Sequence, residues 1–238
     1  MNSPDCIIIN GDSYSAPHTT TKVYGDFLSE QLGIPVKNYA IAGSNNDRIL
    51  RSTIEYLHTI RLQYQQPLVI IGWSFIRRLE VWYYGNHQGV IGSIPDKKDL
   101  SEHQQPRFVT LDRLLNLGEA TLEQKSLIND DLSVHKQLTD FYTSLYLLGN
   151  FLESQNLNYL FFSAAQNTEV PIHCFPYLQE LHQVHWVASN NKIFKLHDFC
   201  IQDWAKEHDP DSKPVTGHLS EFGHKLFADF LQHNLLSR

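Results

Sequence analysis

Cysteine and long apolar runs are scarce in this sequence. Its three cysteines, Cys6, Cys174 and Cys200, are too few and too scattered to form a disulfide framework. No apolar stretch approaches the roughly 20 residues that cross a bilayer. The first residues also lack the charged and apolar regions of a signal peptide. We therefore expect a cytoplasmic protein that has no membrane partner.

Positive charge is scarce as well. The 238 residues include 19 Lys and Arg against 26 Asp and Glu, which gives a formal net charge of −7. The basic residues are scattered, whereas nucleic-acid binding rests on a basic patch or stripe. We therefore expect no nucleic-acid partner. The hydrophobic share of 42% is ordinary for a globular protein, and the length suits one large α/β domain.

Short apolar runs alternate with segments of helical period along most of the chain. This pattern predicts a parallel sheet of about five strands, covered by helices on both faces. The expected strands are Cys6–Asn10, Val36–Ala40, Pro67–Gly72, Tyr159–Ser163 and, more weakly, Lys192–Leu196. The expected helices span about residues 20–32, 45–62, 131–155 and 220–235.

The segment from about Tyr84 to Asp130 departs from this alternation. It is polar, contains several Gly and Pro residues, and shows little periodicity before Leu111. A segment of this length without regular structure is usually functional or mobile. We interpret it as an insertion into a single domain of residues 1–238, either a lid near the site or a surface excursion without a role.

Three polar segments follow or precede expected elements at places suited to chemistry. Gly11-Asp12-Ser13 comes directly after the first strand, where open parallel sheets bind ligands, although these residue types also favour ordinary turns. His218 stands just before the closing helix and could serve as the base that a nucleophilic serine requires. Because the sequence has 13 histidines, His218 could equally be a surface residue without a catalytic role. The joint placement of Ser13 and His218 favours a pair.

The third segment, Asn38–Asn46, follows the second strand on the same edge of the sheet. Gly43 would let a backbone N–H approach a developing oxyanion. Ser44 or Asn45 would cap the helix that begins here. Both interpretations can hold together.

Four segments together resemble the SGNH (GDSL-like) hydrolase superfamily. IINGDSYS, NYAIAGSNN, IIGWS and GHLSEFGHKLFADFL are similar to its blocks one, two, three and five, in that order. The resemblance implies a flavodoxin-like three-layer α/β/α sandwich and hydrolysis of esters, thioesters or acetylated sugars without a metal or cofactor. It assigns Ser13 as nucleophile and oxyanion donor, Gly43 as second donor and His218 as base.

Two positions depart from the family pattern. The slot of an oxyanion-hole asparagine reads Ser74, whose hydroxyl could donate in its place, as could Asn45 or Asn46. The slots of the acid, two or three residues before the histidine, hold Thr216 and Val215. We expect Asp211 to orient His218, with Asp209 as second choice or a backbone carbonyl in a Ser–His dyad.

A local group of histidines and a cysteine carries weak metal-ligand character. His173, Cys174, His182 and His185 match no recognised ligand spacing, so we expect no metal site. The sequence therefore predicts a serine esterase that acts on a small-molecule or carbohydrate ester. The alternative is a binding or structural protein that kept the fold after losing catalytic parts.

Overall fold

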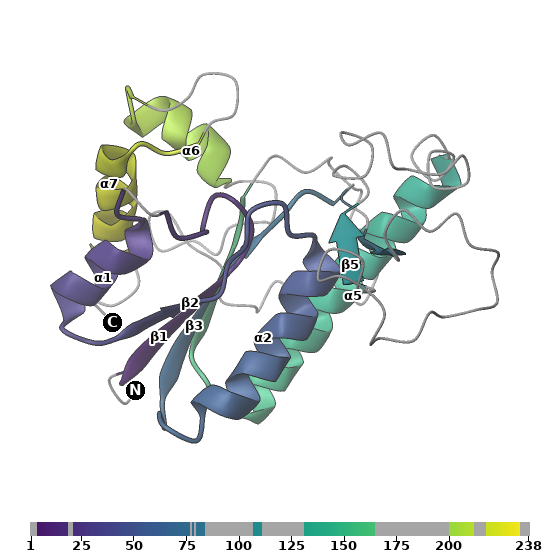
Figure 1. Cartoon of the computed structure of the whole chain (residues 1–238), viewed down its shortest axis with the longest axis horizontal. Coiled ribbons are helices and arrows are strands. Elements are labelled where there is room, and N and C mark those ends of the chain that lie inside the picture. Colours follow the sequence, from purple (N-terminus) through teal and green to yellow (C-terminus); the bar gives the residue numbers. More distant parts are fainter. Residues whose placement is uncertain are drawn as a thin grey trace, which may run out of the picture.

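A four-stranded parallel sheet forms the centre of the computed structural model, which describes residues 4–18, 21–76, 78, 80–83, 107–110, 131–164, 200–211 and 218–233. Its strand order is β2-β1-β3-β6 (Figure 1). The strands are β1 (Cys6–Asn10), β2 (Val36–Asn38), β3 (Pro67–Trp73) and β6 (Tyr159–Ser163). Ile8 pairs with Lys37 on one side and with Val69 on the other.

Helices cover both faces of this sheet. They are α1 (Tyr24–Leu32), α2 (Asn46–Ile60), α5 (Asp131–Ser154), α6 (Ile201–His208) and α7 (Glu221–Leu231). Figure 1 shows α1, α6 and α7 on one side, and α2 and α5 on the other. Within the described part of the chain, no helix is long and apolar enough to cross a membrane.

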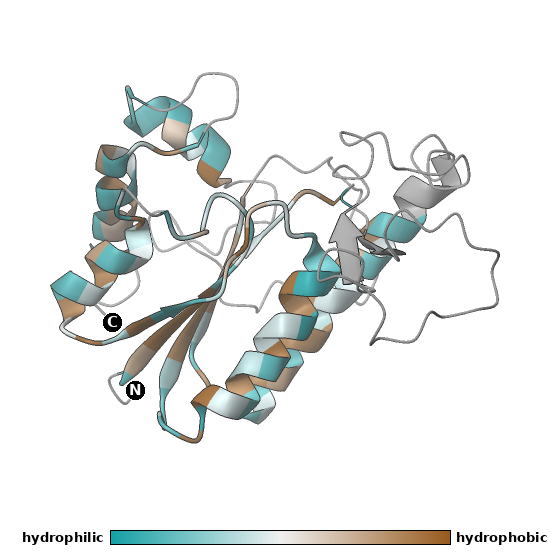
Figure 2. Ribbon diagram, viewed as in Figure 1, coloured by the Kyte–Doolittle hydropathy of each residue, from teal (hydrophilic) through white to brown (hydrophobic). Residues whose placement is uncertain are grey.

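Strand β1 is buried on both faces because its side chains alternate between two cores. Cys6 and Ile8 belong to the core shared with α2 and α5. Ile7 and Ile9 belong to the core shared with α1, α6 and α7. In Figure 2 strand β1 is accordingly brown over most of its length, whereas the helices carry both brown and teal residues.

The first core is centred on aromatic side chains. Trp73 at the end of β3 is fully buried and meets Phe141 of α5 and Phe161 of β6 edge-on, with ring centroids 5.7 and 5.5 Å apart. Such edge-to-face contacts stabilise packing beyond the area they bury. They fix α5 against the sheet.

The predicted three-layer α/β/α sandwich is confirmed, with differences in detail. Helix α6 was not expected, because only Ile201, Trp204 and Ala205 mark its short apolar face. The expected strand at 192–196 lies outside the described residues, although a parallel bridge between Ser163 and Cys200 extends the sheet beyond β6.

The expected insertion at 84–130 lies largely outside the described residues as well. Strands β4 (Glu80–Tyr83) and β5 (Arg107–Thr110) pair antiparallel as a separate two-stranded sheet at and inside its boundary. The segment therefore carries regular structure where little was expected. The sequence signal for β5 is weak: Phe108, Val109 and Thr110 favour strands, but four residues are too few to show a period.

Two adjacent leucines of α5 test the packing of the first core. Leu148 is fully buried, whereas Leu147 is 54% exposed. We expect Leu148→Ala to lower the free energy of unfolding by about 2 to 5 kcal/mol, through lost burial and the cavity it leaves. Leu147→Ala in the same helix is the matched control and should change it by less than about 1 kcal/mol. Urea unfolding measures both, and equal losses would contradict this packing.

Candidate active site

Three loops meet at the carboxyl edge of the sheet. They follow β1, β2 and β3, where the strand order reverses around β1 and where open α/β sheets bind ligands. Backbone bonds hold the loops together, because Ile41 N donates to Gly11 O at 3.2 Å. Ser74 N donates to Asn46 Oδ1 at 2.8 Å. The loop after β1 lies between the other two loops, because β1 lies between β2 and β3 in the sheet.

A tight turn presents Ser13 at this edge. Tyr14 N donates to Asp12 Oδ1 at 3.1 Å, and Ser15 N donates to Asp12 O at 3.0 Å. The turn packs closely on β3, since a Cβ atom at Gly11 would lie 2.9 Å from the carbonyl oxygen of Gly72. Asp12 and Tyr14 are buried and Ser13 is half-buried, so the turn directs its central side chain outward.

His218 reaches Ser13 from the far end of the chain. Its Nε2 lies 2.8 Å from Ser13 Oγ. The ring of Tyr14 lies flat against the imidazole, with centroids 4.4 Å apart and planes 3° from parallel. This stacking restricts rotation of the imidazole. The distance is that of a hydrogen bond and suits proton transfer from a hydroxyl to a neutral histidine.

Two backbone N–H groups, those of Ser13 and Gly43, lie on the loops that follow β1 and β2. Within the described residues, neither the Ser13 N–H nor the Gly43 N–H donates to a protein acceptor. Gly43 has φ +81°, which favours glycine, and open space lies where a Cβ would stand. Backbone donors of this kind can stabilise a negative oxygen.

The expectation that Ser74 supplies a further oxyanion donor needs correction. Ser74 is fully buried, and its hydroxyl donates to Asp12 Oδ2 at 2.7 Å. A hydroxyl has one proton to donate, and this one is engaged. Asn45 and Asn46 are also committed to the fold. Asn45 Oδ1 caps α2, and the Asn46 amide bonds both the N–H and the C=O of Ser74.

The expectation that Asp211 orients His218 is likewise wrong, and so is the second choice. Asp211 is exposed, and within the described residues its only hydrogen bond runs from its N–H to Asp209 Oδ1. The buried Asp209 carboxylate accepts from Ser220 N at 2.6 Å and from Ser220 Oγ at 2.8 Å. It serves the start of α7, where helix N–H groups need acceptors and favour negative charge.

The sequence-based interpretation also missed two residues of this edge. Tyr14 was not singled out, although its place next to Ser13 puts an aromatic ring beside the site. Arg78 was not assigned to the site either, yet its Nη1 lies 3.0 Å from Asp12 Oδ2. The signal for Arg78 is indirect: a buried Asp needs a counter-charge, and Arg78 follows Ser74 by four residues.

Comparison with known proteins assigns the family. A model described as a family of unknown function, DUF6071, matches residues 12–212. The chain belongs to this family. No curated protein matches it.

Solved structures show what the fold is similar to. The psychrotrophic esterase EstA from Pseudoalteromonas sp. is 13% identical, with 98% of this chain and 97% of that chain covered and a TM-score of 0.50. Protein YXIM from Bacillus subtilis is 12% identical, with a TM-score of 0.51. The match covers 99% of this chain and 57% of that one, so this DUF6071 chain spans little more than half its length. At such identity the likeness concerns the fold alone: the chain shares its α/β fold with these two proteins.

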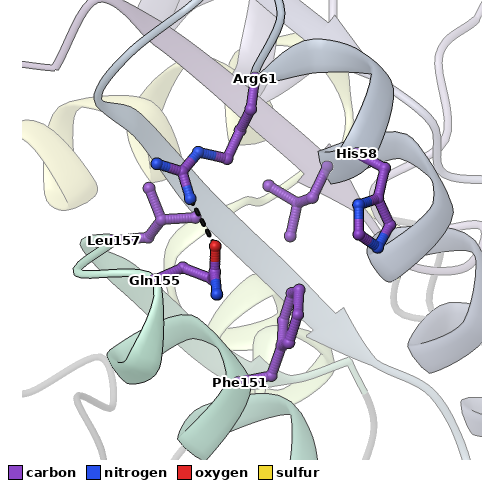
Figure 3. A pocket seen from close by; sticks show the side chains of 6 residues that line it. His58, Arg61, Phe151, Gln155 and Leu157 are labelled. Carbon is purple, nitrogen blue, oxygen red and sulfur yellow. Dashed lines mark hydrogen bonds between the residues drawn. The ribbon is translucent and has the colours of Figure 1, made fainter.

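A pocket of about 310 Å³ lies elsewhere, between the ends of α2 and α5 (Figure 3). Its lining consists of Leu57, His58, Arg61, Phe151, Gln155 and Leu157. Helix α2 starts beside the Ser74 loop and runs 15 residues, roughly 20 Å, before it reaches this pocket. The pocket therefore belongs to the opposite edge of the sheet. The described residues contain no cluster suited to a metal ion, and His173, Cys174, His182 and His185 lie outside them.

A second histidine is buried near the site. His224 of α7 packs beside Tyr24, whose hydroxyl donates to Ser15 Oγ at 3.0 Å. Within the described residues, His224 Nδ1 is buried without a hydrogen-bond partner. Burial above all lowers the pKa of His224 to about 4, with a smaller contribution from His18. The imidazole is therefore neutral in the folded protein near pH 7.

Asp209 and Asp211 give a matched pair of variants for the start of α7. We expect Asp209→Asn to lower the free energy of unfolding by about 1 to 3 kcal/mol, because an amide NH₂ would replace one of the two oxygens that accept hydrogen bonds from Ser220. Asp211→Asn is the control and should have little effect, since that side chain is exposed. Denaturant unfolding at pH 7 measures both. A loss for Asp211→Asn as large as that for Asp209→Asn would contradict the assignment.

The burial of His224 predicts a specific pH dependence of stability. The unfolded chain takes up this proton below the ordinary pKa of 6.5, and the folded protein only near 4. The free energy of unfolding should therefore fall as pH drops from 6.5 towards 4, by up to about 3 kcal/mol from this residue. His224→Phe should make that fall shallower in urea titrations between pH 7 and 4.5. The exposed His58→Phe serves as control, and an unchanged slope in His224→Phe would refute the prediction.

Proposed function

We propose that this chain is a serine esterase of the SGNH type that hydrolyses short-chain or carbohydrate O-acyl esters. The observation that carries the proposal is the 2.8 Å contact between His218 Nε2 and Ser13 Oγ. A serine becomes a nucleophile when an adjacent base accepts its proton. The fold shared with the esterase EstA supports the same class of reaction.

The geometry supports a two-step acyl transfer. Ser13 Oγ attacks the ester carbonyl carbon while its proton passes to His218 Nε2, and the carbonyl oxygen gains the electron pair. The N–H groups of Ser13 and Gly43 would stabilise that oxyanion. The C–O bond then breaks, and His218 returns the proton to the departing alcohol. Water, activated by His218 in the same way, releases the acid from acyl-Ser13.

The parallel ring of Tyr14 contributes orientation. It holds the imidazole flat while Nε2 alternates between accepting and donating a proton. An aromatic face also stabilises the imidazolium cation that exists during each step. Tyr14 is buried, so this support is present before substrate arrives.

A non-catalytic binding protein is the second candidate, and two observations favour it. Ser74 is engaged with Asp12, which leaves two backbone donors where the family pattern has a third from a side chain. Neither Asp209 nor Asp211 bonds His218 within the described residues. Loss of one oxyanion donor costs about 100- to 1000-fold in rate in a studied protease. The esterase proposed here is accordingly a slow one.

Hydrolysis of p-nitrophenyl acetate and butyrate tests the assignment. We expect Ser13→Ala and His218→Gln each to lower kcat by about 1000-fold or more, because each removes a reacting group. Ser154→Ala and His208→Gln, which alter exposed positions on α5 and α6, are the matched controls and should retain activity.

A fluorophosphonate probe separates the two candidates without a choice of substrate. Such a probe reacts only with an activated serine, so labelling mapped to Ser13 by peptide mass spectrometry supports the esterase. Labelling should vanish in Ser13→Ala and fall in His218→Gln. A wild-type protein that is neither labelled at Ser13 nor active on either ester would favour the binding protein.

A further inference from the structure

The carboxylate of Asp12 is fully buried one residue before Ser13. Its Oδ1 accepts from Tyr14 N, and its Oδ2 accepts from Ser74 Oγ at 2.7 Å and Arg78 Nη1 at 3.0 Å. Burial raises the pKa of Asp12, and the Ser74 hydroxyl, the Tyr14 N–H and the Arg78 charge oppose that rise. A buried carboxylate without a counter-charge is costly. Arg78 is therefore the cation that this turn depends on.

The same guanidinium nitrogen reaches two further loops. Arg78 Nη1 lies 2.9 Å from Ser74 Oγ and 3.3 Å from Ser44 O. Its two protons are thus shared among acceptors that follow β1, β2 and β3. The guanidinium packs over the Phe75 ring at 4.8 Å, and the side chain is only 20% exposed. These contacts hold Arg78 in one place.

Each of the Ser13 and Gly43 N–H groups is one residue from a contact of Arg78. Asp12 precedes Ser13, and Ser44 follows Gly43. The Ser44 hydroxyl has its own partners, since it donates to Ile41 O and accepts from Arg48 Nη1. Arg78 holds the Ser44 carbonyl instead, which belongs to the backbone that carries the Gly43 N–H.

We propose that Arg78 is a positioning residue that clamps the Ser13 turn to the Gly43 loop and so sets the spacing of the two oxyanion donors, a role that rests on the proposed esterase function. Ser74, which stands where the SGNH pattern has an asparagine, anchors this clamp. Because that slot supplies no third oxyanion donor, the rate depends on the placement of the two backbone N–H groups. Misplacement by about 1 Å can cost about 100-fold in an enzyme.

Steady-state kinetics of Arg78→Met and Arg78→Lys test the clamp. We expect Arg78→Met to lower kcat by about 100-fold with KM nearly unchanged, because misplaced donors affect the transition state more than substrate binding. Arg78→Lys should recover part of kcat, since an ammonium restores the charge but lacks the planar fork. Arg61→Met, at the exposed end of α2, is the control and should match the wild type.

The pH profile distinguishes the clamp from general loss of stability. Without Arg78, Asp12 should take up a proton at higher pH, so the acid limb of kcat should move upward in Arg78→Met. In an Asp12→Asn background position 12 carries no carboxylate, so Arg78→Met should leave the acid limb of kcat at the same pH. Unchanged kcat in Arg78→Met, or a limb that moves equally in both backgrounds, would overturn the proposal.

Backbone amide resonances test the clamp without a measurement of catalytic activity. In ¹⁵N-labelled protein, Arg78→Met should shift the amide resonances of both Ser13 and Gly43, and Arg61→Met should shift neither. If the wild type hydrolyses no ester and resists the fluorophosphonate probe, the esterase assignment fails while these shifts still decide whether Arg78 couples the loops. Unshifted Ser13 and Gly43 amides in a folded Arg78→Met protein would refute the clamp itself.

Discussion

A carboxylate buried at the carboxyl edge of the sheet constrains the whole candidate site. Asp12 has no access to water, so the surrounding loops must supply its hydrogen bonds and its counter-charge. The turn that exposes Ser13, the hydroxyl of Ser74 and the guanidinium of Arg78 all converge on it. The positions of these groups therefore depend on one another.

The buried side-chain amide of Asn10 constrains the position of helix α2 in a similar way. Asn10 accepts from Gly11 N at 2.9 Å and donates to Ile49 O, Ser52 Oγ and Thr53 Oγ1 of α2. The last residue of β1 is thereby bonded both to the start of the Ser13 turn and to α2, whose N-cap lies in the Gly43 loop. Polar bonds inside an apolar core are effective at specifying one arrangement, because an unmade bond there is expensive.

The far end of the chain depends on another buried carboxylate. Asp209 holds Ser220, and Ser220 Oγ in turn caps α7 by accepting from Gly223 N. Asp209 packs so closely on Gly223 that a side chain there would collide with it. His218 lies two residues before this cap. A residue expected to orient the imidazole directly thus acts on the start of the helix that follows it.

Much of the fold was determined by the sequence alone, whereas hydrogen-bond partners at the site were decided by tertiary structure. Apolar periodicity is local, so β1, β3, α5 and β6 were located from it, and the order of the motifs placed Ser13 and His218 at one edge. Helix α6 was missed because eight residues hold too little periodicity. The assignments of Ser74 and Asp211 failed for a different reason. A hydroxyl or carboxylate donates and accepts according to its neighbours in space. Spacing along the chain could not show that the Ser74 hydroxyl would donate its hydrogen bond to Asp12. Nor could it show that the Asp209 carboxylate would accept hydrogen bonds from Ser220.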